Sequence, residues 1–104
     1  MNSEQANLIK SRFLEIMKAS DSVIIDDGAL LTLGEEAPDD DIFYISWITD
    51  DGYESCHIPD SSFEPVNNPH INADGNFELK DNKGHNTIIS FFKVEHMPAD
   101  RIIV

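Results

Sequence analysis

The sequence predicts an α+β fold in which an N-terminal helix packs on a mainly antiparallel sheet of about five or six strands built from hairpins. Three observations lead to this prediction. Apolar residues recur at helical spacing near the N-terminus, the apolar segments that follow are separated by glycine-containing turns, and the length of 104 residues suits one domain. We therefore expect residues 1–104 to form a single domain with one hydrophobic core.

The predicted helix covers residues 3–19. Its apolar side chains recur every three or four residues and would form one buried stripe: Ala6, Ile9, Phe13, Ile16 and Met17. Either Asn2 or Ser3 can cap the start of this helix, and Glu4 lies in the first turn, where the helix dipole favours an anion.

Residues 22–34 favour two short strands around an Asp-Gly turn. A two-residue loop at that turn would place Ile25 opposite Leu30 and Val23 opposite Thr32. A continuing helix is the competing interpretation, because Ala-Leu-Leu favours helix. The glycine and the β-branched run argue against that helix.

The segment 42–49 is the most apolar run of the chain and predicts a buried strand around which the fold is organised. The Asp-Gly pair that follows predicts a hairpin with Trp47 opposite Cys56 and Ile45 opposite Ile58. Both strands independently place their large apolar side chains on one face. The expected core face is Phe43, Ile45, Trp47, Cys56 and Ile58.

The last third of the chain predicts another hairpin, after a long polar connection that Phe63 and Val66 would pin to the core. A three-residue loop ending in glycine would pair Phe77 with Ile89, and Leu79 with Thr87. The returning strand has apolar residues on its second face too, so we expect a central strand covered on both sides: Ile88, Phe92 and Val94. The segment Ile102-Ile103-Val104 would add a short closing strand.

The net charge of −13 is unevenly distributed along the chain. Between Ala19 and Leu79 there are fifteen acidic residues and no lysine or arginine. The flanks hold all seven basic residues and the other five acidic ones, so they are slightly positive. We expect the central carboxylates to gather on one exposed, strongly negative face. The competing interpretation is a generic acidic protein whose charge serves only solubility.

Enzymatic chemistry finds little support in the sequence. Cys56 and His57 are neighbours on a predicted strand and point to opposite faces, so they cannot form a nucleophile–base pair. The four histidines lack metal-ligand spacing, and the segment that starts at Asp74 departs from a calcium loop at the glycine and glutamate positions. The sequence also lacks a phosphate-binding glycine loop, a nucleophile elbow and a dinucleotide fingerprint. We predict no enzyme, no metal and no cofactor.

Features that the sequence lacks also bear on where the protein is located and on what it contacts. The single cysteine excludes an internal disulfide and fits a reducing compartment. The sequence contains neither a signal-peptide pattern nor an apolar run long enough for a membrane span, so we expect a cytoplasmic protein. Three basic residues on the N-terminal helix are too few for direct nucleic-acid contact.

We therefore expect a small, acidic, non-enzymatic protein that binds and inhibits a basic partner, such as a nuclease toxin or a nucleic-acid-guided effector. It would act as an immunity protein or antitoxin, or as a nucleic-acid-mimicking inhibitor of the anti-CRISPR type. The residues expected to contact the partner are the acids that bracket the apolar strand and two tyrosines: Glu35, Glu36, Asp39, Asp40, Asp41, Tyr44, Asp50, Asp51, Tyr53 and Glu54. The alternative is an adaptor or structural subunit.

Overall fold

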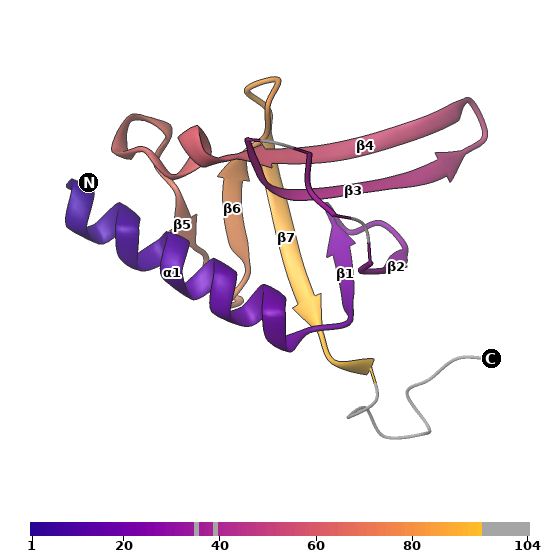
Figure 1. The fold of residues 1–104 in the computed structure, drawn as a ribbon, viewed down its shortest axis with the longest axis horizontal. Coiled ribbons are helices and arrows are strands. Elements are labelled where there is room, and N and C mark those ends of the chain that lie inside the picture. Colours follow the sequence, from indigo (N-terminus) through magenta and orange to yellow (C-terminus); the bar gives the residue numbers. More distant parts are fainter. Residues whose placement is uncertain (35, 39, 95–104) are drawn as a thin grey trace.

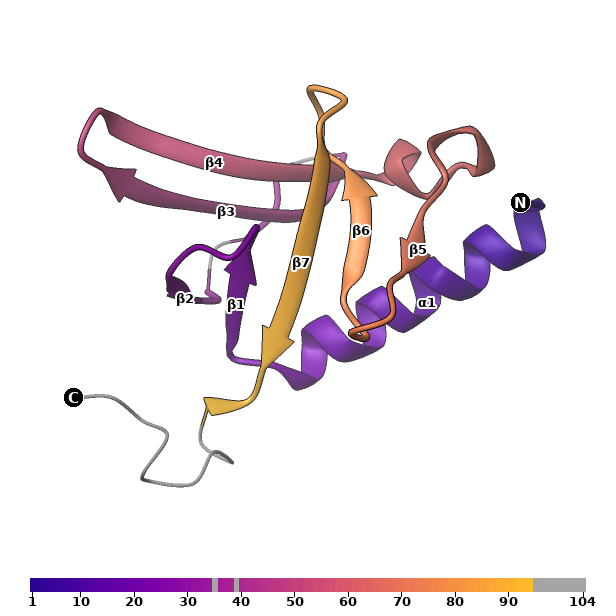
Figure 2. The same ribbon diagram turned by 180° about the vertical axis from the view of Figure 1, so that it is seen from behind.

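The structure is a computed structural model that describes residues 1–34, 36–38 and 40–94. It confirms the predicted α+β fold class (Figures 1 and 2). The elements in chain order are α1 (Ser3–Ala19), β1 (Ser22–Ile25), β2 (Leu30–Thr32), β3 (Asp41–Thr49), β4 (Gly52–Pro59), the 3-10 helices η1 (Asp60–Phe63) and η2 (Pro65–Asn67), β5 (His70–Ile71), β6 (Phe77–Lys80) and β7 (Asn86–Phe92).

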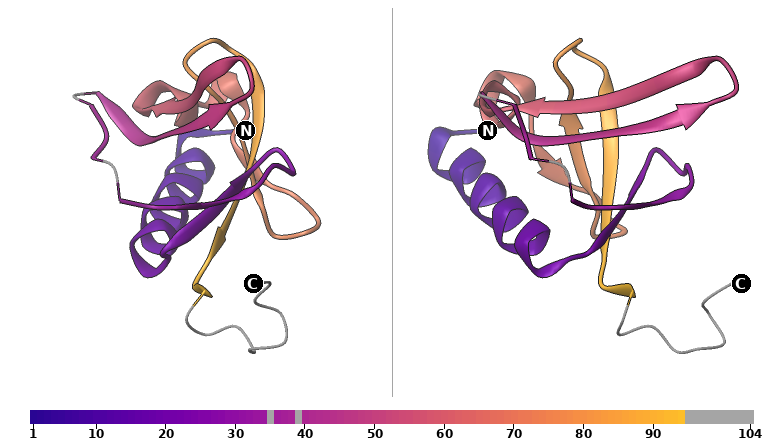
Figure 3. Two further views of the ribbon diagram at one scale, coloured as in Figure 1. Left: turned by 90° about the vertical axis from the view of Figure 1, so that its right-hand side faces the viewer. Right: turned by 45° about the vertical axis from the view of Figure 1, so that its right-hand side comes forward.

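The strands form two sheets. Five strands make an antiparallel sheet in the order β2-β1-β7-β6-β5, and β3 pairs with β4 in a separate two-stranded sheet. Helix α1 and the β3–β4 hairpin lie on the same face of the large sheet (Figure 3). No described helix or strand lies over the opposite face, which we call the outer face.

Helix α1 spans the predicted residues, and Asn2 is its cap. The Asn2 side chain accepts a hydrogen bond from the backbone N–H of Gln5 at 2.8 Å, and the Gln5 side chain accepts one from the backbone N–H of Asn2 at 3.0 Å. This reciprocal pair satisfies two N–H groups that the helix itself leaves free. Over the described residues, no helix has the length and apolarity required to cross a membrane.

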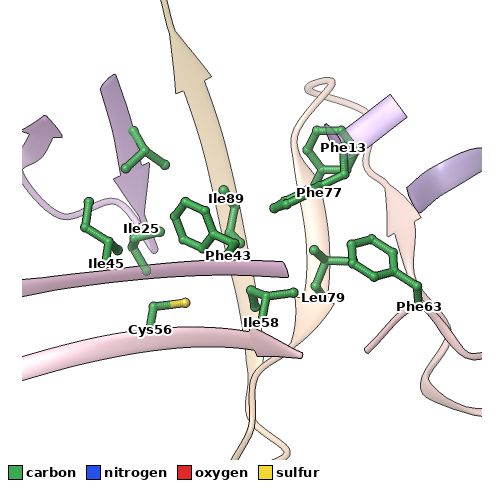
Figure 4. Packing of buried hydrophobic residues seen from close by; sticks show 11 residues of the cluster. Phe13, Ile25, Phe43, Ile45, Cys56, Ile58, Phe63, Phe77, Leu79 and Ile89 are labelled. Atoms are coloured by element: carbon green, nitrogen blue, oxygen red, sulfur yellow. The ribbon is translucent and has the colours of Figure 1, made fainter. Parts of the chain in front are cut away.

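The core is built around Phe13, whose side chain is fully buried. Its ring makes edge-to-face contacts with four other phenylalanines at centroid distances of 5.1–5.9 Å: Phe43, Phe63, Phe77 and Phe91. These rings come from β3, η1, β6 and β7, so one helical side chain joins four other elements of the fold (Figure 4). The sequence placed Phe13 on the buried stripe, and the structure confirms it.

The register predicted for the first hairpin is wrong by one residue. Leu30 pairs with Ile24 rather than with Ile25, because Asp26 and Asp27 form the centre of the turn, with φ values of 50° and 61°. Gly28 follows the turn, and its N–H donates to the Ile25 carbonyl at 2.9 Å. A slip of one residue exchanges the faces of a strand, and Leu30 is accordingly 47% exposed.

The register predicted for the β3–β4 hairpin is wrong by two residues. Ile45 pairs with Cys56, because the two-residue loop is Asp50-Asp51 and glycine comes just after it. A slip of two residues leaves every side chain on its predicted face, so the expected core face is kept. Trp47 is the exception, since it is only half-buried. The prediction of a buried strand holds only for the first half of β3, where Phe43 and Ile45 are buried.

The third hairpin has the predicted register, with Phe77 opposite Ile89 and Leu79 opposite Thr87. Strand β7 is central, between β1 and β6. The expected cover on its second face is absent from the described residues, and Ile88 and Phe92 are partly exposed there. In the connection before this hairpin, Phe63 is buried as predicted, but Val66 is 84% exposed. The predicted closing strand at residues 102–104 lies outside the described residues.

The conformation of Gly52 yields a first prediction. This residue has φ +125°, which L side chains rarely adopt, and it ends the turn of the β3–β4 hairpin. Replacing Gly52 with alanine should lower the free energy of unfolding by about 1–3 kcal/mol through backbone strain. Urea denaturation would measure the change. Gly34→Ala is the matched control, since no atom lies within 4 Å of the position that its methyl group would take, and it should cost nothing. Equal changes in the free energy of unfolding for the two substitutions would contradict backbone strain at position 52.

Candidate functional site

The β3–β4 hairpin is an arm that extends past the edge of the large sheet (Figures 1 and 3). Near its base, Phe43 and Ile58 pair across the strands and are buried against the sheet. Near its end, the cross-strand pair of Ile48 and Tyr53 is 76% and 80% exposed. We call residues 48–54 the arm tip.

The structure places the predicted partner-binding residues in two groups. Asp50, Asp51, Tyr53 and Glu54 are exposed at the arm tip. The others belong to the opposite end of the arm, and those that the structure describes are Glu36, Asp40, Asp41 and Tyr44. Because β3 is nine residues long, the two ends are about 27 Å apart at roughly 3.4 Å per residue. The predicted Glu35 and Asp39 lie outside the described residues.

At the base of the arm, two of the predicted residues make contacts within the fold. The Asp41 carboxylate lies 2.8 Å from Nδ1 of His57, and the aspartate side chain is only 16% exposed. The Tyr44 ring packs against the same imidazole, with ring centroids 4.6 Å apart. Glu36 and Asp40 are exposed. The base therefore offers fewer free groups to a partner than the sequence suggested.

A groove of about 510 Å³ runs beneath the arm, between the hairpin and the turns at the upper end of the large sheet. Its apolar wall includes Trp47 and Cys56 from the arm and Ile25 and Leu31 from β1 and β2. Figure 4 shows Cys56 and Ile45 lying close to Ile25. The charged residues that line the groove are Asp26, Glu54, Asp81 and Lys83, with His85 beside them. With neutral histidine, the lining carries a net negative charge.

Two of these carboxylates also hold turns in place. The Asp26 side chain accepts a hydrogen bond from the backbone N–H of Ile88 at 2.8 Å. The Asp81 side chain accepts bonds from the N–H groups of Lys83 and His85 at 2.8 and 2.9 Å. Glu54 differs from them, because its exposed carboxylate accepts no hydrogen bond from the described residues and it lies directly opposite Trp47 across the hairpin. Glu54 is thus the carboxylate of the groove most available to a ligand.

The thiol of Cys56 is a buried core group. Burial, and next the carboxylates of Asp81, Asp26 and Asp41, raise its pKa from 9.0 to about 12. A nucleophilic cysteine requires the opposite shift, because the thiolate is the reactive form. The structure therefore supports the interpretation of Cys56 as a core residue.

This pKa predicts how stability depends on pH. Between pH 9 and 12 the unfolded chain loses the thiol proton while the folded chain keeps it, so stability should fall as pH rises through this window. Below pH 9 the folded and the unfolded chain both keep the thiol proton, so the contribution of Cys56 to stability has its full value. Urea unfolding of the wild type and of Cys56→Ala would measure it. The stability difference between the two proteins should shrink above pH 9. A difference that stays constant with pH would contradict the raised pKa of the thiol.

Metal chemistry has no support in the described residues, where no three His, Cys, Asp or Glu side chains are grouped to hold an ion. The segment compared with a calcium loop is an Asx turn. The Asn72 side chain accepts hydrogen bonds from the N–H groups of Asp74 and Asn76 at 3.0 and 3.1 Å, and Gly75 has φ +81°.

Several groove residues were not identified from the sequence. The strand pattern assigns Trp47 to the core, and the sequence does not mark Asp26 or Asp81 as functional. Asp26 and Asp81 belong to turns that meet only when the first and third hairpins pair through β1 and β7. The two adjacent aspartates before Gly28 were the one local signal of an unusual turn, since Asp tolerates the left-handed region.

Comparisons with protein-family models, with curated proteins and with solved structures found no match for this chain.

Proposed function

We propose that this chain is a small acidic binding protein that inhibits a basic, nucleic-acid-processing protein by contacting it through the arm tip. The observation that carries the proposal is the combination found there. An exposed aromatic–aliphatic pair, Tyr53 and Ile48, is bordered by the carboxylates of Asp50, Asp51 and Glu54. Interfaces commonly combine an aromatic anchor with a charged rim that steers association.

The charge of the chain supports a cationic partner. A protein that processes nucleic acid presents a positive groove to phosphates, and carboxylates can occupy that groove in their place. Charge complementarity of this kind raises association rates by about 10- to 1000-fold at low salt. Occupation of the groove would exclude the nucleic acid.

The distribution of the acids favours a local plug over an extended mimic of nucleic acid. A mimic needs carboxylates in a row at roughly 6–7 Å, the phosphate spacing along one strand of a duplex. Between the two ends of the arm, the outward face carries Tyr44, Ser46 and Ile48 on β3, and Tyr53, Ser55 and His57 on β4, none of them acidic. An immunity protein or antitoxin that blocks one active site suits this clustering better.

A second candidate function, an adaptor or structural subunit, is favoured by the outer face of the large sheet. Apolar side chains of neighbouring strands are partly or largely exposed there: Ile24, Leu30, Ile88 and Phe92. An adaptor would bury this face against another protein, and the acidity would serve only solubility.

The experiment that tests the proposal is inhibition of a captured partner. The intact tagged chain is used at low salt to capture proteins from its native host, and a captured basic enzyme is assayed on nucleic acid. We expect stoichiometric inhibition, and an association rate that falls steeply between low and physiological ionic strength. Binding that is insensitive to salt and leaves the enzyme active would favour the adaptor.

A further inference from the structure

The backbone of β4 presents a free edge to the groove. In an antiparallel pair, successive residues point their N–H and C=O groups alternately toward the partner strand and away from it. The backbone N–H of Asn82, in the β6–β7 turn, donates to the His57 carbonyl at 3.0 Å. The carbonyl of His57 therefore points away from β3, and so do the backbone groups of Ser55 and Tyr53, two and four residues earlier.

These outward groups are unoccupied in the described part of the chain. No hydrogen bond reaches the outward N–H or C=O of Ser55 or Tyr53, whereas the equivalent group of His57 is taken by Asn82. Both residues are exposed, and four consecutive residues of β4, from Tyr53 to Cys56, line the groove. An unpaired edge of this kind is a template for one more strand.

We propose that an extended, basic segment of the partner protein adds to this edge of β4 as a further strand. The inference rests on the proposed binding of a basic partner and specifies how it docks. Strand addition supplies affinity through main-chain hydrogen bonds, while pockets for alternate side chains supply specificity. The β6–β7 turn already makes the first contact of this edge at His57.

The groove determines the chemistry of the added segment. Its volume of about 510 Å³ falls within the usual range of roughly 300–1,000 Å³ for ligand sites. Trp47 provides an aromatic wall, and Glu54 is its cross-strand partner. A lysine or arginine side chain can pack its aliphatic part on the indole and bring its charge to the carboxylate. A second copy of this chain is disfavoured, because each copy carries a net charge of −13.

The test uses the intact chain and a short synthetic peptide of alternating lysine and valine. We expect the peptide to bind and to protect the amides of Tyr53 and Ser55 from hydrogen exchange. The same peptide is then N-methylated, in one version on the lysine amides and in another on the valine amides. In an extended peptide only one of these two sets of amides points toward β4. The version methylated on that set should bind at least about tenfold more weakly than the unmodified peptide, because it loses one or two hydrogen bonds.

A matched pair of variants tests the same edge from the side of the protein. Ser55→Pro removes an N–H that β3 does not use, so an edge strand tolerates it, whereas Ser55→Ala keeps that N–H. We expect Ser55→Pro to abolish binding of the peptide and Ser55→Ala to bind like the wild type. If Ser55→Pro does not fold, the methylated peptides with the wild-type chain decide the question.

Three results would overturn the proposal: no binding of the peptide, equal binding of all its methylated versions, or protection of these amides by dimerisation of the chain without peptide. These results differ from a failure of the proposed function. A basic enzyme inhibited equally by the wild type and by folded Ser55→Pro would leave inhibition standing and exclude pairing at this edge.

Discussion

Replacing Phe13 with alanine is expected to lower the free energy of unfolding by about 3–5 kcal/mol. The side chain is fully buried and contacts phenylalanine rings from four other elements. Its removal deletes those contacts and leaves a cavity that no single neighbour can fill. Since domains of this size are stable by only about 5–15 kcal/mol, the variant should unfold at much lower urea concentration.

Leu8→Ala is the matched control for this prediction. Leu8 lies on the same helix but is 66% exposed, so its truncation should change stability by less than about 0.5 kcal/mol. Comparable losses in the two variants would mean that the helix contributes through its intrinsic stability, and that the phenylalanine cluster is not the centre of the core.

Charge reversal at the arm tip should strongly slow association with the basic partner. In the double variant Asp50→Lys/Asp51→Lys, the steering carboxylates become cations that the partner repels. We expect the association rate at low salt to fall by about tenfold or more, toward the rate of a neutral encounter. Stopped-flow mixing with the captured enzyme would measure it.

The control reverses two exposed acids at the base of the arm, in the variant Glu36→Lys/Asp40→Lys. It changes the net charge by the same amount, and Asp40 adjoins the start of β3, whose two ends are about 27 Å apart. Both variants are also compared at physiological salt, where the screening length of about 8 Å is far shorter than this separation. We expect a smaller decrease in association rate than for the tip variant. Equal decreases would show that overall charge governs association and that the tip has no special part.

Local sequence determines much of this fold, and the errors have identifiable causes. The register of the third hairpin was predicted correctly because Gly84 closes a loop of standard length and takes φ +80°. The first register failed because two aspartates, not the Asp-Gly pair, adopt the left-handed turn. The arm register failed because Gly52 follows the loop instead of completing it.

The candidate site was harder to predict because it depends on how the hairpins pack together. The strand pattern correctly assigned Phe43 and Ile45 to the core. The strand pattern did not show that the large sheet ends before Ile48. Because the sheet ends there, the rest of the arm projects beyond it. The groove also requires the turns at Asp26 and Asp81 to meet the inner face of the arm. Contacts of this kind are non-local, and alternation along one strand carries no information about them.

Hydrogen exchange of the intact chain, alone and bound to the captured basic enzyme, tests the central claim most directly. We expect the backbone amides of residues 48–55 to become protected in the complex, while Ile24, Ile88 and Phe92 on the outer face keep their exchange rates. Protection of the outer face with an unchanged arm tip would contradict inhibition through the tip and identify the chain as an adaptor.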